Sequence, residues 1–167
     1  MKRKSVGWPI IGVIALMLVF IGFAGLAEEG VEVRARVTGM ILLTIESGDT
    51  IGFYVDPLHN PRDTAKTELS VMTNIAEYNI IATFGDFKIG DYDLIAGERF
   101  FIRVDAPGSG EGIDEWTVPE AKMVILSNED GLTAREKIVI RFMLRIDFTV
   151  PPGEGELEVT FTAVPSL

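Results

Sequence analysis

Apolar and polar residues alternate along much of the chain between Val31 and Ala163. In the longest run every second residue from Ile138 to Phe148 is apolar, and Arg141, Arg145 and Asp147 are among the residues between them. A helix would spread these apolar residues around its circumference, whereas a strand gathers them on one face. Shorter runs with the same period occupy residues 31–37, 78–84, 100–104 and 157–163. The pattern predicts antiparallel sheets with one face packed on a core.

Turn-forming residues separate the alternating runs, as at Ser47-Gly48-Asp49, Gly90-Asp91 and Pro151-Pro152-Gly153. Glycine supplies positive φ angles and proline presets φ for turns. The spacing predicts about eight or nine short strands in a single antiparallel β-sandwich, immunoglobulin-like or jelly-roll-like. Only residues 63–67 and 132–136 are expected to hold a helical turn. No linker divides the chain, so residues 28–167 are predicted to form one domain.

The first 27 residues have the layout of a secretory signal peptide. Lys2, Arg3 and Lys4 precede an uncharged apolar run, and small residues at Gly25 and Ala27 suit cleavage before Glu28. A retained membrane anchor is the alternative, because roughly 20 apolar residues span a bilayer as a helix. In both cases the basic residues stay in the cytoplasm and the rest of the chain is exported. The predicted location is therefore the cell surface or the extracellular medium.

Charge and composition exclude several classes of function. The 167 residues include 15 Lys and Arg, 25 Asp and Glu, one His and no Cys, for a formal charge of −10. Removal of residues 1–27, which hold three of the cations, leaves −13. Nucleic-acid binding requires a basic footprint, so this balance argues against it. The absence of Cys excludes disulfides, thiol catalysis and thiolate metal sites.

Two patches of sequence carry a family resemblance. One runs from Leu69 to Asn74 and continues with Tyr78-Asn79-Ile80, and the other runs from Val150-Pro151-Pro152-Gly153 to Ala163. Together they resemble exported prokaryotic cell-surface β-sandwich proteins, namely WxL-like surface domains and the subunits of biofilm fibres and pili. The resemblance implies an adhesive, matrix or filament component. The paired Trp-x-Leu motifs of the WxL group are missing, so it does not imply wall attachment through them.

Catalytic chemistry has few candidates, and we predict that the chain is not an enzyme. His59 lies in a proline-bracketed loop, where Asp56 or Asp63 could pair with it. A secreted hydrolase remains the third-ranked function, because acidic residues at 111, 114 and 115 precede Trp116, which could stack on a sugar. The alternative is a solvated acidic loop with Trp116 turned into the core.

Calcium is the cofactor that the composition suits best, because Ca²⁺ prefers oxygen ligands. Two groups of acidic residues are the candidates for metal ligands, although neither has the spacing of a known calcium loop. The candidates are Asp86, Asp91 and Asp93 beside Gly90, and Asp105, Glu111 and Asp114.

Two functions of different classes fit these features. The first is a structural or adhesive fibre or matrix subunit, in which Val31, Val33, Ala35 and Val37 form a strand that inserts into a neighbour's sheet. The same residues could instead be the first strand of their own domain. The alternative is a binding module for a glycan or protein partner, with Trp116 and Tyr92 as exposed anchors. The expected partners are other copies or cell-surface proteins and glycans.

Overall fold

The computed structural model describes residues 35–36, 38–106, 108, 110–128 and 133–166. These residues form ten strands and no helix, which confirms the all-β prediction. The strands are β1 (Ile41–Ser47), β2 (Arg62–Thr73), β3 (Tyr78–Phe84), β4 (Lys88–Ile89), β5 (Tyr92–Asp93), β6 (Phe100–Asp105), β7 (Ile113–Thr117), β8 (Lys122–Asn128), β9 (Thr133–Arg145) and β10 (Val159–Pro165). The helical turns expected at residues 63–67 and 132–136 are wrong where the structure describes them, because residues 63–67 lie in β2 and residues 133–136 in β9. Pairing along these two long strands overrides the local preference.

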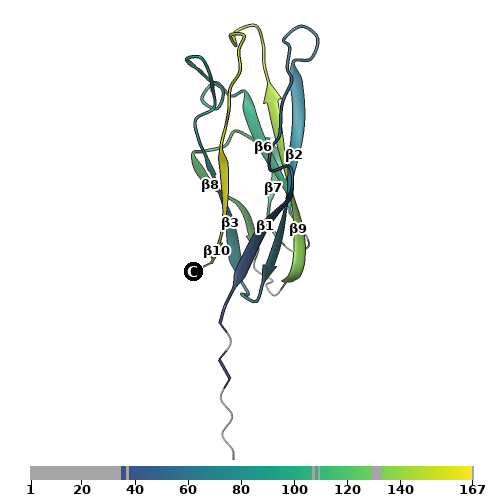
Figure 1. The fold of residues 1–167 in the computed structure, drawn as a ribbon, viewed down its shortest axis with the longest axis vertical. Coiled ribbons are helices and arrows are strands. Elements are labelled where there is room, and N and C mark those ends of the chain that lie inside the picture. The colour runs from purple at the N-terminus through teal and green to yellow at the C-terminus, as the bar shows by residue number, and fades with distance from the viewer. Residues whose placement is uncertain (1–34, 37, 107, 109, 129–132, 167) are drawn as a thin grey trace, which may run out of the picture. The chain divides into compact units, whose positions relative to one another are not determined.

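The strands form two antiparallel sheets and a small hairpin (Figure 1). The larger sheet has the order β1-β2-β9-β6-β7, and the smaller sheet has the order β10-β3-β8. The two-residue strands β4 and β5 pair with each other. Side chains from both sheets belong to one apolar cluster, the arrangement of a β-sandwich.

The longest ladder joins β2 and β9 and runs from Arg62 opposite Arg145 to Thr73 opposite Thr133. Its core-facing positions include Leu69 opposite Ile138, and both side chains are fully buried. At the end of β1, Gly48 has φ +71°, and a Cβ there would lie 2.4 Å from the carbonyl oxygen of Lys66. A glycine is therefore required where β1 turns toward β2.

A buried polar group joins the two sheets at one end of the core. The Tyr78 hydroxyl of β3 lies 3.3 Å from a Glu136 carboxylate oxygen of β9, and Asn128 of β8 donates to both groups. Burial raises the pKa of Tyr78, and the negative charge of Glu136 adds to this effect. Tyr78 therefore remains a neutral hydrogen-bond donor inside the core.

Asn74, just beyond β2, holds the backbone that leads into β1. Its side-chain oxygen accepts from Met40 N at 2.6 Å, and its side-chain nitrogen donates to Thr38 O at 3.0 Å. The expected signal helix, residues 1–27, lies outside the described residues. Among the residues that are described, no helix is long and apolar enough to span a membrane.

Phe100 is the centre of the aromatic packing in the core. Its ring meets Phe53 and Phe87 edge-on at centroid distances of 6.2 and 5.2 Å, and stacks on Phe142 at 5.8 Å. We expect Phe100→Ala to lower the free energy of unfolding by about 3–5 kcal/mol, because it leaves a cavity among three rings. Chemical denaturation measures this loss.

Phe148 provides the matched control, because it is the same residue type but 79% exposed. Phe148→Ala should change the unfolding free energy by less than about 0.5 kcal/mol. Equal losses for the two variants would contradict the central position of Phe100.

Candidate functional site

Seven basic residues of β2, β6 and β9 lie on the outer face of the larger sheet. Arg135 pairs with Glu46, and we call the other six the cationic strip. Within β9 the basic residues share one parity, opposite to that of the buried Ile138 and Ile140. The alternation of a strand therefore places them on the face away from the core. The same holds for the basic residues of β2 and β6. The cationic strip consists of Arg62 and Lys66 on β2, Arg103 on β6, and Lys137, Arg141 and Arg145 on β9.

The strand register sets cations of the strip directly opposite one another. Arg62 faces Arg145 and Lys66 faces Arg141 across the β2–β9 ladder. Arg103 faces Arg141 across the β6–β9 ladder. Like charges at directly opposite positions of a sheet destabilise it. Three such pairs therefore stand side by side on one face of a chain that is acidic overall.

Two carboxylates lie within the strip, and each serves two cations. Glu68 pairs with Lys66 at 2.8 Å and with Lys137 at 2.5 Å. Asp105 pairs with Arg141 at 2.8 Å and with Arg103 at 3.4 Å. The strip thus contains six cations and two carboxylates, so it carries a formal excess of four positive charges.

The hydrogen bond from Lys137, followed by that from Lys66, lowers the pKa of Glu68 to about 2. This carboxylate is therefore ionised at any physiological pH and holds the two ammonium groups in place. The strip keeps its charge pattern over that whole range.

Arg62 and Arg145 form no ion pair with any residue that the structure describes. The Arg145 guanidinium lies over the Phe101 ring, 5.3 Å from its centroid, and this contact orients it. Both arginines line a depression of about 460 Å³ together with Pro61 and Ile146. Both arginines are exposed to solvent.

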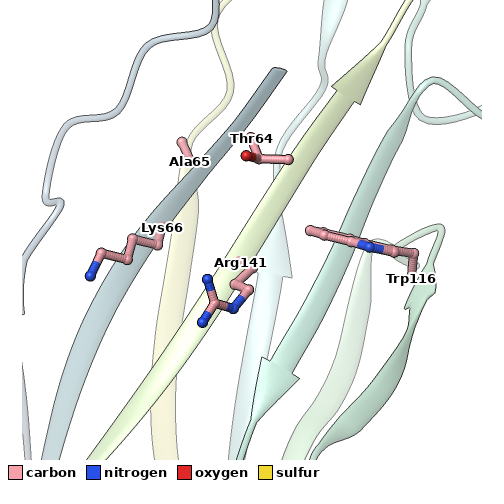
Figure 2. A pocket seen from close by; sticks show the side chains of 5 residues that line it. All are labelled: Thr64, Ala65, Lys66, Trp116 and Arg141. Atoms are coloured by element: carbon pink, nitrogen blue, oxygen red, sulfur yellow. The ribbon is translucent and has the colours of Figure 1, made fainter. Parts of the chain in front are cut away.

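A second depression of about 280 Å³ lies further along the same ladder (Figure 2). Thr64, Ala65 and Lys66 of β2, Arg141 of β9 and Trp116 of β7 line it. Figure 2 shows the Trp116 indole extended from β7 toward Thr64 and Arg141, with Lys66 on the far side. An aromatic face and two cations thus border one hollow.

The two predicted anchor residues lie apart from each other. Trp116 is half-buried at the second depression and is not part of the core cluster, so its predicted turn into the core is wrong. Tyr92 belongs to the β4–β5 hairpin and packs against the core. A Cβ at Gly97 would lie 2.7 Å from the Tyr92 hydroxyl, so this side chain covers the Gly97 backbone. Neither depression includes Tyr92.

The first group of predicted calcium ligands surrounds the β4–β5 hairpin. Asp86 pairs with Lys88 at 2.9 Å, and Asp91 is exposed in the turn after Gly90. Asp93 accepts from Ile95 N and Ala96 N, both at 2.9 Å. Asp86 thus pairs with a lysine and Asp93 caps a turn.

The second group is spread over two strands and a loop. Asp105 pairs with Arg103 and Arg141, and Asp114 is exposed on β7. Glu111 forms a backbone bridge to Ser127 beside β8. Among the described residues, no three carboxylate or imidazole side chains lie close enough together to hold a metal ion.

The predicted pairing of His59 with Asp56 is confirmed, with Nδ1 of His59 2.9 Å from a carboxylate oxygen of Asp56. This contact lowers the pKa of Asp56, and a hydrogen bond from Leu58 N adds to the effect. Asp63 instead accepts from Tyr54 N and Thr64 N. The His59 side chain is 76% exposed and lies in neither depression, so the contact braces a surface loop.

The sequence motifs did not predict the cationic strip. Its signal was present in the shared parity of Lys137, Arg141 and Arg145. The pairing that sets Arg62 and Lys66 beside them follows from the ladder register.

Comparison with known proteins identifies no matching family model and no similar curated protein.

The low pKa of Glu68 predicts a pH-dependent contribution to stability. The ordinary value is 4.5 and the folded value is about 2, so ionised Glu68 stabilises the fold above about pH 4.5. That contribution is lost as the pH falls toward 2. Glu68→Gln should therefore lower the Tm at pH 7, and the difference from wild type should shrink between pH 4.5 and pH 2. Thermal unfolding followed by circular dichroism measures it.

Glu120→Gln is the matched control, because Glu120 is exposed between β7 and β8 and forms no ion pair with a described residue. It should leave the Tm nearly unchanged across the same range. A Tm difference for Glu68→Gln that stays constant from pH 7 to pH 2 would refute the role of its charge.

Proposed function

We propose that the chain is an exported structural or adhesive surface protein that assembles into a fibre or matrix by strand addition at β10. The open edge of β10 carries this proposal. In strand addition, an extended segment of one chain pairs with the exposed edge of another chain's sheet, and pockets for alternate side chains give specificity. The support comes from the properties of that edge and from the sequence that precedes β1.

The free edge of β10 lacks the features that usually protect an edge strand. Natural edges carry charged side chains, bulges or prolines, which block pairing with other chains. β10 pairs with β3 at seven consecutive positions without a register shift, and it has no charged residue. Its only proline is Pro165, the last residue of the strand. The strand therefore lacks the usual protection of an edge, and the other strand that comes near it is β1 of the larger sheet.

The other edge strands of the two larger sheets are protected. β1 carries Glu46 and a register shift, and β7 carries two acidic residues and a register shift in its pairing. The backbone bridge between Glu111 and Ser127 covers part of the free side of β8. Of these four edges, β10 alone has neither a charge nor an irregularity.

The predicted donor segment precedes the first described strand. Of its four apolar residues, Ala35 is described, and it is exposed and outside any strand. Val31, Val33 and Val37 lie outside the described residues. The fold begins its sheets at Ile41, so the run at 31–37 is a candidate donor for a second copy. Donation in this head-to-tail sense does not close on itself and therefore builds a filament.

The strand pairing favours the jelly-roll-like variant of the sandwich over the immunoglobulin-like one. β2 pairs with β9, β3 with β8 and β6 with β7, so the pairs are nested in sequence. Nested antiparallel pairs divided between two sheets are typical of jelly rolls. This topology is compatible with the resemblance to exported surface and fibre proteins, and residues 1–27 would supply the export signal.

Paired variants of the donor segment test the assembly. We expect the exported wild-type chain to sediment as a series of oligomers of increasing size in sedimentation velocity. Replacing the apolar row (Val31→Asn, Val33→Asn and Val37→Asn) should leave monomers, because these side chains would fill the acceptor sheet. Replacing the alternate row (Glu32→Asn, Arg34→Asn and Arg36→Asn) is the matched control and should leave the series of oligomers unchanged.

The acceptor edge is tested separately. Thr160 and Thr162 are exposed on β10, and Thr160→Lys with Thr162→Lys adds the charges that usually protect an edge. This variant should remain folded and monomeric. A wild-type chain that stays monomeric at all concentrations, or an apolar-row variant that assembles as well as wild type, would show that strand addition is wrong.

A further inference from the structure

We propose that the cationic strip binds a linear polysaccharide that carries carboxylate groups, with one sugar ring seated against Trp116. This site does not depend on strand addition at β10. It is carried by the like-charge pairs across the β2–β9 and β6–β9 ladders and by the two depressions that open between them.

Repulsion between the cations of the strip destabilises the protein when no ligand is bound. Arg62 opposite Arg145, Lys66 opposite Arg141 and Arg103 opposite Arg141 each place two positive charges at adjacent sheet positions. Two carboxylates shared by four cations offset only part of this repulsion. A bound polyanion would offset the rest, so the arrangement suits a ligand that supplies several negative charges.

Most donors of the strip are free to meet such a ligand. An arginine has five N–H donors, and Arg141 uses its Nε for Asp105 while its terminal nitrogens have no partner among the described residues. Arg62 and Arg145 form no ion pair with a described carboxylate, and Arg145 interacts with Asp147 only at longer range. Guanidinium groups bind carboxylates through two parallel hydrogen bonds, and they bind phosphate in the same way, so the arginines suit a ligand whose anionic groups present paired oxygens.

The two depressions follow one another along β2 and β9, so a ligand with repeating units can reach both. Arg62 and Lys66 are four residues apart on β2, as are Arg145 and Arg141 on β9. With a rise of about 3.4 Å per residue, the two cation pairs lie about 14 Å apart. The smaller depression, about 280 Å³, is near the lower limit of ligand pockets, which are roughly 300–1,000 Å³. It therefore suits one unit of an extended chain.

Trp116 distinguishes a polysaccharide from other polyanions. Its indole is an apolar ring that lines the same depression as Lys66 and Arg141, and a sugar ring presents a flat C–H face that can pack on such a ring. Single-stranded nucleic acid is usually bound on several aromatic side chains, whereas this depression has one.

The net charge of the chain does not prevent binding at this face. At physiological ionic strength the Debye length is about 8 Å, so more distant exposed charges are largely screened. At the Arg145 end the nearby carboxylate of Asp147 is engaged by Arg99 at 2.7 Å and by Thr149.

Binding of the full chain to immobilised polygalacturonate tests the site, with dextran as the neutral polymer. We expect retention on polygalacturonate alone, with weakening as NaCl rises from 50 to 200 mM. Arg141→Gln, and the double change Arg62→Gln with Arg145→Gln, should each weaken binding at least about tenfold. Lys122→Gln removes the same charge from β8 in the smaller sheet and should leave affinity unchanged.

Two further measurements separate a ligand site from a structural role. Arg62→Gln removes a like-charge pair and breaks no ion pair, so its Tm should equal or exceed that of wild type while its affinity falls. Trp116→Ala should weaken polygalacturonate binding, and Trp116→Phe should restore most of it.

The proposal is overturned if polygalacturonate is retained no better than dextran, or if the strip variants bind as tightly as Lys122→Gln. Duplex DNA and phosphatidylglycerol vesicles serve as competitors at equal charge concentration. If either displaces the polymer fully and binds independently of Trp116, the strip is a general polyanion surface and the polysaccharide assignment is wrong.

Discussion

The antiparallel ladder between β2 and β9 fixes both faces of the larger sheet at once. Leu69 and Ile138 face the core from opposite positions of this ladder, while Lys66 and Arg141 face solvent from another pair of opposite positions. Because side chains alternate with a period of two, a slip of one residue would turn the apolar row outward and the cations inward. Burial of the core therefore holds the register, and the register in turn sets the spacing of the cationic strip.

This coupling explains how the fold tolerates an unfavourable surface. Two like charges at directly opposite positions of a sheet lower the stability of the fold by fractions of a kcal/mol to about 1 kcal/mol. A fully buried Leu or Ile side chain raises it by about 1.5–3 kcal/mol. The core residues of β2, β6 and β9 thus outweigh the three like-charge pairs on the other side of the same strands. Glu68 and Asp105 reduce the cost further, because each lies between two cations.

The sequence was sufficient to predict the all-β fold class, but it predicted only part of the cationic strip. Alternation in residues 138–148 predicted the core face of β9, and its apolar residues from Ile138 to Leu144 are buried. The prediction is wrong for Phe148, which lies beyond the strand and is 79% exposed. The same alternation placed Arg141 and Arg145 on the opposite face. The residues opposite them are distant in sequence, because Arg103 is 38 residues from Arg141 and Arg62 is 83 residues from Arg145. Register between such distant strands depends on the whole core.

Trp116 shows the same limit more sharply. Its neighbours in sequence are acidic, and on that basis calcium ligands or catalytic carboxylates were expected beside it. Its neighbours in space are Lys66 and Arg141, which belong to other strands of the sheet. The charge of the expected ligand is thereby reversed, from a cation to an anion.

The proposed assembly edge and the cationic strip lie on different sheets, and this separation bears on how they would act together. β10 is the edge of the smaller sheet, whereas the strip covers the outer face of the larger one. Strand addition at β10 would therefore leave the strip open on every subunit of a filament. A long polysaccharide could then contact several subunits at once, and each contact after the first would form at a high effective concentration. Weak binding by one chain would in this way become firm attachment by a fibre, without any change in the site itself.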